Sequence, residues 1–207
     1  GFEALIRWHH PTRGMVPPDE FIPVLEQSRQ IVPLGYWIIE QCMQQCLSLL
    51  HSGWHHFRIA INLSAEQFVD PELIPTLKRL LDKYELQGSY FELELTERTL
   101  VQSIETMLNI MSQIKAMGIH FAIDDFGTGF SSLSRLKNLP ITCVKIDRSF
   151  VMTIPHQLND VEITKAVCAL CQALQLKVVA EGVETIQQKE FLEQLHCDYA
   201  QGYLFAK

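Results

Sequence analysis

The sequence has no run of basic residues and no long apolar segment. Its 207 residues include 17 Lys and Arg against 24 Asp and Glu, which gives a formal net charge of -7. A chain without a basic run has no electrostatic grip on a nucleic-acid polymer, because such binding depends on cations that release counterions from the phosphates. No apolar stretch approaches the roughly 20 residues that span a bilayer, and the first residues lack a signal-peptide pattern. We therefore expect a soluble, cytoplasmic chain that contacts neither a nucleic-acid polymer nor a membrane.

The cysteine pattern does not indicate a disulfide framework. Six cysteines are scattered through apolar stretches, at Cys42, Cys46, Cys143, Cys168, Cys171 and Cys197. This distribution is typical of reduced thiols in the core of a cytosolic protein. The one CxxC, from Cys168 to Cys171, lies within a helical stretch and has no second pair and no histidine nearby. A role of these two cysteines in helix packing is therefore a better interpretation than a metal or redox role.

Apolar strand-like segments alternate with helical stretches along the whole chain, without a linker or a break in composition. We expect strands at residues 2–7, 57–63, 90–96, 120–124, 143–147, 177–181 and 199–205. We expect helices from Pro17 onward and at residues 31–50, 70–84, 103–117, 131–137, 159–174 and 185–195. This order predicts an α/β fold with a mostly parallel sheet. Seven strands are one short of a (β/α)8 barrel and the chain begins inside its first strand, so we expect a barrel that lacks its N-terminal strand here.

Polar and charged residues close the predicted strands. They are Glu3, Arg7, Asn62, Glu94, Asp124, Lys145, Glu181 and Gln201. Strands covered by crossover helices have no water on their outer side, so this polar set must face into the barrel, at the carboxyl ends where barrel active sites lie. Several carboxylates with an amide oxygen make a site for Mg²⁺ or Mn²⁺. The deeper residues Arg58, Glu92 and Lys177 are better interpreted as ion pairs within the barrel.

The stretch at residues 120–133 carries two adjacent carboxylates followed by a glycine loop. Neighbouring strand residues point to opposite faces, so Asp124 and Asp125 share one pocket only if the strand ends between them and the backbone turns. Gly127 and Gly129 permit that turn. On this stretch alone, a metal site and a helix cap with an Asx turn both stay open. The polar ends of the other strands favour the metal site.

Several motifs follow one another in a characteristic order. They are Glu3-Ala4-Leu5 with Arg7-Trp8, Ile61-Asn62-Leu63-Ser64, Glu94-Leu95-Thr96-Glu97, Asp124-Asp125-Phe126-Gly127-Thr128-Gly129, Lys145-Ile146-Asp147, Glu181-Gly182-Val183-Glu184-Thr185 and Gln201-Gly202-Tyr203. With them the sequence resembles the EAL family of bacterial cyclic-di-GMP phosphodiesterases, from Glu3 to the end. The resemblance implies a modified (β/α)8 TIM-type barrel whose first strand runs antiparallel, and this is the strand that the chain lacks. Residues 1–207 would then be a single, N-terminally truncated EAL-type phosphodiesterase domain.

The resemblance also assigns roles to individual residues. The implied metal ligands are Glu3, Asn62, Glu94, Asp124, Asp125 and Glu181. Glu3, Asn62, Glu94 and Asp124 would hold one ion, and Asp124, Asp125 and Glu181 a second. The implied substrate-binding residues are Arg7, Asp147, Glu184 and Gln201. Lys145 would act in catalysis with Glu181 and Glu3, and Glu97 would anchor the loop at residues 125–132. Phe130 stands where many members carry tyrosine.

The implied activity is hydrolysis of cyclic-di-GMP to linear pGpG with two Mg²⁺ or Mn²⁺ ions, which lowers a bacterial second messenger. The resemblance further implies a homodimer and regulatory domains elsewhere in the full-length protein, which could be membrane-anchored through other regions. One alternative is a catalytically silent EAL domain that acts as a cyclic-di-GMP receptor or a protein-interaction module. Degenerate members usually lose the EAL glutamate, a metal ligand or the loop motif, and none is lost here. A metal-dependent barrel enzyme for another phosphoester is the third interpretation.

Overall fold

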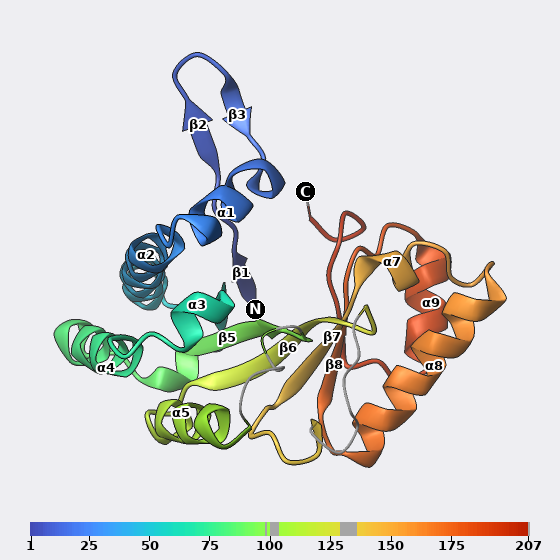
Figure 1. Cartoon of the computed structure of the whole chain (residues 1–207). Coiled ribbons are helices and arrows are strands. Elements are labelled where there is room, and N and C mark those ends of the chain that lie inside the picture. The colour runs from blue at the N-terminus through green and yellow to red at the C-terminus, as the bar shows by residue number, and fades with distance from the viewer. Residues whose placement is uncertain (98, 100–103, 129–135, 207) are drawn as a thin grey trace. The chain divides into compact units, whose positions relative to one another are not determined.

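The computed structural model describes residues 1–97, 99, 104–128 and 136–206 (Figure 1). The chain divides into two compact units. The first unit comprises Gly1–Leu95 with Gln102–His120, and the second comprises Thr96–Val101 with Phe121–Lys207. Each unit combines parallel strands with helices, as the predicted α/β class requires. Phe130 and most of the helix predicted at residues 131–137 lie outside the described residues.

Three parallel strands form the sheet of the first unit. They are β1 (Phe2–Ala4), β4 (Ile59–Asn62) and β5 (Phe91–Thr96). Their apolar side chains alternate and are buried, at Ile59, Ile61, Phe91, Leu93 and Leu95. The register places Glu3 level with Ala60, and Asn62 level with Glu94. The predicted alternation therefore brings the polar strand ends of this unit to one edge of its sheet.

Helices of the first unit lie beside this sheet. They are α1 (Pro18–Gln27), α2 (Ile31–His51), α3 (Ala65–Phe68), α4 (Leu73–Tyr84), the 3-10 helix η1 (Gly88–Tyr90) and α5 (Ile104–Ala116). Helix α4 shows why such segments fold here, because its leucines recur at helical spacing and are buried on one face. Helix α2 contacts α3, α4 and strand β4. The expected helices at 31–50, 70–84 and 103–117 are confirmed within a few residues.

An antiparallel hairpin follows β1 and corrects one prediction. The predicted strand at residues 2–7 ends at Ala4, and the chain then forms β2 (Trp8–His10) and β3 (Gly14–Val16). Gly14 takes a φ of 74° at the turn, a conformation that glycine adopts readily. The Trp8 ring packs edge-on against Phe21 of α1, with centroids 5.5 Å apart. The turn residues Pro11 to Gly14 were the sequence signal for this hairpin.

Four parallel strands form the sheet of the second unit. They are β6 (His120–Phe126), β7 (Cys143–Ile146), β8 (Lys177–Ala180) and β9 (Tyr199–Ala200), paired in that order. The strand predicted at residues 199–205 is wrong beyond Ala200. Val183 N donates to Gln201 O, and Phe205 N donates to Gly202 O, so the backbone after Ala200 bonds to a loop and to itself. Those bonds replace a continued ladder with β8.

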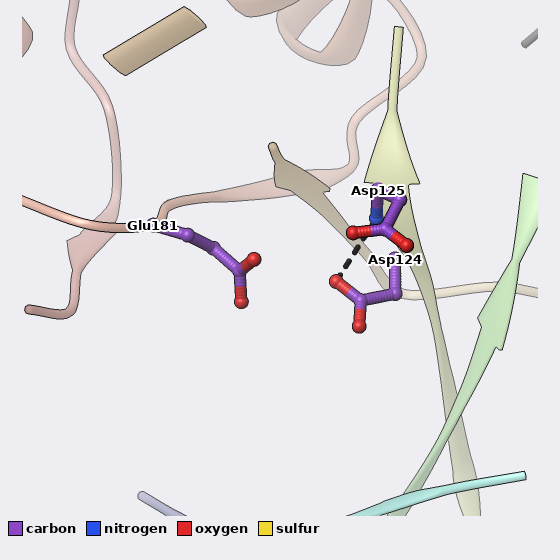
Figure 2. A group of neighbouring side chains, drawn as sticks. All are labelled: Asp124, Asp125 and Glu181. Atoms are coloured by element: carbon purple, nitrogen blue, oxygen red, sulfur yellow. Dashed lines mark hydrogen bonds between the residues drawn. The ribbon is translucent and has the colours of Figure 1, made fainter. Parts of the chain in front are cut away.

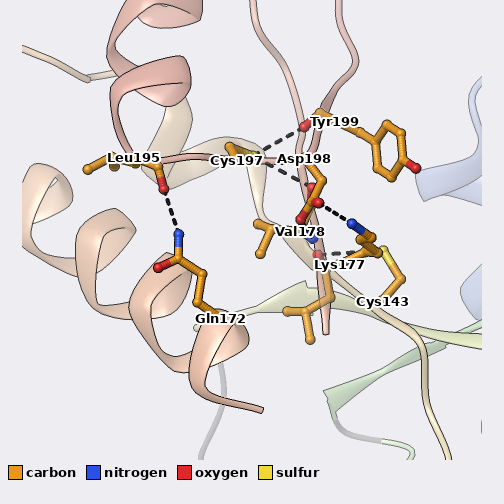
Figure 3. A network of polar contacts seen from close by, with 9 residues as sticks. Cys143, Gln172, Lys177, Val178, Leu195, Cys197, Asp198 and Tyr199 are labelled. Atoms are coloured by element: carbon orange, nitrogen blue, oxygen red, sulfur yellow. Dashed lines mark hydrogen bonds and ion pairs between the residues drawn. The ribbon is translucent and has the colours of Figure 1, made fainter. Parts of the chain in front are cut away.

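The described residues of the second unit include the helices α7 (Arg148–Val151), α8 (Leu158–Ala173) and α9 (Ile186–Gln194). Helix α8 contacts β7 and β8 and lies beside α9, where Gln172 Nε2 donates to Leu195 O at 3.0 Å (Figures 1 and 3). Cys168 and Cys171 are buried in α8, and burial raises the pKa of the Cys171 thiol to about 12. That thiol is therefore not an activated nucleophile. No helix in the described part of the chain is long and apolar enough to cross a bilayer.

The beginning of β8 is held by Asp198. Its carboxylate accepts from Lys177 Nζ at 2.6 Å and from the Val178 amide at 3.0 Å (Figure 3). Lys177 is thus ion-paired, as expected, but its side chain is 60% exposed. It therefore lies at the surface of the second unit and not in an interior.

Candidate active site

A bulge near the end of β6 brings two carboxylates together. The pairing of β6 with β7 shifts between Ile123 and Phe126, and Asp125 takes the left-handed φ of 54°. This bulge lets adjacent residues turn toward one pocket, which a regular strand forbids. Asp125 N donates to Asp124 Oδ1 at 3.0 Å, and the Thr128 hydroxyl donates to Asp125 O at 2.8 Å.

Glu181, which directly follows β8, joins this pair. One carboxylate oxygen from each of Asp124, Asp125 and Glu181 lies within 4.8 Å of the others (Figure 2). Asp124 is 9% exposed, so part of the cluster is shielded from water. Three carboxylates at such spacing repel one another unless a cation neutralises them.

Lys145 supplies one such cation. It lies on β7 with its side chain 3% exposed, and its Nζ is 3.3 Å from Asp124 Oδ1 and 2.7 Å from Glu181 Oε1. Glu181 Oε1 also accepts from Gln201 Nε2 at 2.9 Å. The side chains of Lys145, Glu181 and Gln201, predicted from three different strand ends, therefore meet in the second unit.

The charge balance of this cluster fits a divalent ion. Burial raises the pKa of the Asp125 carboxyl, and the negative charges of Asp124 and Asp147 raise it further, against the opposing effect of Lys145. Asp125 thus retains a proton more readily than an ordinary aspartate. Carboxylate oxygens are the ligands that Mg²⁺ and Mn²⁺ prefer. The carboxylates of Asp124, Asp125 and Glu181 therefore fit a hard divalent cation.

Glu97 is placed to hold the chain that follows Asp125. Its side chain is buried, and Oε2 accepts from the Gly127 amide at 3.3 Å. Glu97 thus contacts the described part of the loop, and its anchoring of residues 125–132 stays a prediction.

In the first unit, Glu3 and Asn62 are in direct contact. Asn62 Nδ2 donates to Glu3 Oε1 at 2.9 Å, and Asn62 is level with the buried Glu94 in the parallel ladder. Arg7 is exposed and donates to the carbonyl oxygen of Ile6 at 2.9 Å. The structure therefore groups the three predicted ligands of this unit, while the phosphate contact of Arg7 stays a prediction.

The deeper polar residues of the first unit behave as expected. Arg58 Nη1 lies 3.0 Å from Glu92 Oε2, so this predicted ion pair is present. Burial lowers the pKa of the nearby His120, and the positive charge of Arg58 lowers it further. These residues have a structural role in the first unit.

Asp147 and Glu184 both have structural partners in the second unit. Asp147 caps α7, because its Oδ1 accepts from the Ser149 amide at 3.0 Å and from the Ser149 hydroxyl. Glu184 Oε1 accepts from Arg148 Nη2 at 2.9 Å. Neither contact tests the predicted contact with substrate.

The sequence did not single out Arg148 and Gln188, which contact the segments next to the candidate site. The pattern Thr185-x-x-Gln188 at the start of α9 is a capping box, and it was the available signal for Gln188. No local pattern indicated Arg148.

Comparisons with known proteins agree on one family. The EAL domain family model matches residues 1–207. The bifunctional diguanylate cyclase/cyclic di-GMP phosphodiesterase MucR of Pseudomonas aeruginosa is 42% identical over 207 residues, which are 100% of this chain and 30% of MucR. The cyclic di-GMP phosphodiesterase PdeR of Escherichia coli is 40% identical over 205 residues, which are 99% of this chain and 31% of PdeR. The chain thus spans less than a third of these relatives.

Solved structures give the same result for the fold. The Pseudomonas aeruginosa structure titled "PaMucR Phosphodiesterase, c-di-GMP complex" matches with a TM-score of 0.96 and 42% identity, over 99% of this chain and 83% of that one. The EAL enzyme Bd1971, with cAMP and cyclic-di-GMP bound, matches with a TM-score of 0.94 and 35% identity, over 99% and 56% of the two chains. The predicted α/β fold of the TIM-barrel type is confirmed by these neighbours. This chain belongs to the EAL domain family.

Proposed function

We propose that this chain is a metal-dependent phosphodiesterase domain that hydrolyses cyclic-di-GMP to linear pGpG. The observation that carries the proposal is the buried Lys145 between Asp124 and Glu181, with Asp125 beside them. The family supports it, because the relatives MucR and PdeR are named cyclic di-GMP phosphodiesterases.

The side chains of the second unit suit phosphodiester hydrolysis. Asp124, Asp125 and Glu181 would hold Mg²⁺ or Mn²⁺, which supplies an activated water and neutralises charge on the phosphoryl oxygens when bound. Lys145 carries a fixed positive charge that stabilises negative charge developing on a phosphoryl oxygen. Gln201 donates to Glu181 Oε1 and so fixes the orientation of that carboxylate.

The motifs of the family extend this proposal to residues of both units. Glu3, Asn62 and Glu94 are proposed as further metal ligands, with Glu3 in the catalytic set. The proposed substrate contacts are made by Arg7, Asp147, Glu184 and Gln201. The contact of Asn62 with Glu3 supports the first of these assignments.

The test is turnover by the purified full-length protein. With Mn²⁺ we expect conversion of cyclic-di-GMP to pGpG, complete loss after Glu3→Ala, and no loss after Asp82→Asn on the surface of α4. No linear dinucleotide with either Mg²⁺ or Mn²⁺ would overturn the proposal. Tight cyclic-di-GMP binding without turnover would identify a receptor instead. Equal turnover of bis(p-nitrophenyl) phosphate would indicate a less specific phosphoesterase.

We also propose a homodimer and additional regulatory domains. The relatives are about three times longer than this chain, which supports further domains. Sedimentation of the full-length protein with Mn²⁺ and nucleotide should show a dimer, and a monomer at high concentration would contradict it.

A further inference from the structure

We propose that Gln188 is a positioning residue for the candidate site. It joins the loop after β8 (residues 181–185), which carries Glu181, to helix α7, which follows Lys145 and Asp147. This inference rests on the proposed function and assigns a role to a residue outside the metal and substrate motifs.

The buried amide of Gln188 bonds to the loop after β8 and to the end of α7. Its Oε1 accepts from the Glu184 amide at 2.8 Å and from the Thr185 amide at 2.9 Å. Its Nε2 donates to Val151 O at 3.1 Å and to Met152 O at 3.2 Å. The residue is 4% exposed, so its amide makes these four bonds largely away from water.

These contacts exceed what a helix cap needs. A capping box requires the Thr185 hydroxyl to accept from Gln188 N and the Gln188 side chain to accept from Thr185 N, and both bonds are present. The two bonds from Nε2 run instead to the end of α7, at Val151 and Met152. A glutamate would cap α9 equally well but could not donate to α7, so the amide has a second task.

Arg148, the first residue of α7, makes a second contact with the same loop. The aliphatic stem of Arg148 covers Gly182, where an added Cβ would lie 2.3 Å from Arg148 Cγ. The Arg148 guanidinium then reaches Glu184 Oε1 at 2.9 Å. Because the Arg148 side chain is 53% exposed, solvent screens this ion pair and it contributes little. The buried amide of Gln188 is the stronger connection between α7 and the loop.

This connection bears on the distance between Lys145 and Glu181. Lys145 is two residues before Asp147, the cap of α7, and Glu181 N donates to Ile146 O at 3.2 Å. Glu181 begins the loop that Gln188 holds, and its carboxylate lies 2.7 Å from Lys145 Nζ. Any shift of the loop relative to α7 therefore changes the geometry of this pair. Misplacement by about 1 Å can cost a reaction about 100-fold in rate.

Two substitutions in the full-length protein separate capping from positioning. Gln188→Glu keeps the acceptor of the capping box and loses the donor to Val151 O and Met152 O. Gln188→Met loses both. Gln172→Met is the matched control, because Gln172 also donates to a backbone oxygen of the α9 segment, at Leu195, beyond the far end of that helix (Figure 3).

The measurements are steady-state hydrolysis of cyclic-di-GMP at saturating Mn²⁺, well below the unfolding temperature, and amide hydrogen exchange without metal or substrate. We expect both Gln188 variants to lose about 10- to 100-fold in kcat, with KM within about threefold of wild type. Exchange at residues 181–185 and 147–152 should become faster together. Gln172→Met should match wild type in both measurements.

Several results would overturn the inference. One is wild-type kcat and wild-type exchange in Gln188→Glu, which would make Gln188 a helix cap only. Another is a loss of activity that comes wholly from a higher KM or from a smaller folded fraction, with kcat unchanged. If the wild-type protein proves inactive, the proposed function fails, and coupled exchange of the two segments in Gln188→Glu still decides whether Gln188 positions the loop.

Discussion

Lys145 Nζ lies 2.7 Å from Glu181 Oε1, with the lysine side chain 3% exposed and the glutamate side chain 14% exposed. The same ammonium is 3.3 Å from Asp124 Oδ1. Removing one partner of a buried ion pair is costly because the remaining charge stays out of water without compensation. Here the remaining charges would be carboxylates that already crowd one another.

Lys145→Met should therefore destabilise the metal-free protein strongly. We expect a loss of about 3 to 5 kcal/mol in the free energy of unfolding, measured by urea titration with a chelator present. Lys177→Met is the matched control, because Lys177 pairs with Asp198 at the surface, where solvent screens the pair, and its loss should cost far less. Equal losses in the two variants would show that Lys145 does not balance a buried cluster.

Mn²⁺ should stabilise the folded protein through the carboxylates of the second unit. A ligand at 100 times its Kd adds about 2.7 kcal/mol to the stability of the folded state. We expect this gain to be greatly reduced in Asp124→Asn and retained in Asp82→Asn, as measured by thermal unfolding over a Mn²⁺ titration. An undiminished gain in Asp124→Asn would mean that the ion binds elsewhere.

Loss of Glu97 should free the backbone after Asp125. Glu97→Ala removes the carboxylate that accepts from Gly127 N at 3.3 Å, and a bond to a charged acceptor contributes about 1.5 kcal/mol or more. Amide exchange at Gly127 should then be about tenfold faster or more. Glu105→Ala, on the exposed first turn of α5, is the control and should leave that amide unchanged. Unaltered exchange in Glu97→Ala would remove the anchoring role.

His120 should make the protein sensitive to mild acid. Burial and Arg58 lower the pKa of His120, so the folded state resists its protonation. The stability from neutral His120 is present above the pKa of unfolded histidine, about 6.5, and is lost as pH falls through the lower folded pKa. On acidification, wild type should lose more stability than His120→Gln, measured by urea unfolding from pH 8 to 5. His51→Gln should follow wild type, and identical profiles for His120→Gln and wild type would contradict this.

Alternation of apolar residues was sufficient to find most strands. Ile59, Ile61 and Leu93 recur at period two and are buried, because one face of each strand packs in a core. The same reasoning failed at residues 5–7 and beyond Ala200. Leu5 is exposed, and the stretch after Ala200 bonds to the loop at Val183. In both places the apolar residues do not belong to a strand.

The sequence by itself determined the position of most strands, the order of the motifs and the identity of the polar side chains, because these follow from local periodicity and residue chemistry. Only the tertiary structure decided that a bulge at Asp124 and Asp125 turns both carboxylates toward Glu181. It also decided that Gln188 joins the β8 loop to α7. These relationships depend on how segments far apart in the chain pack, and no local pattern in the sequence records that packing.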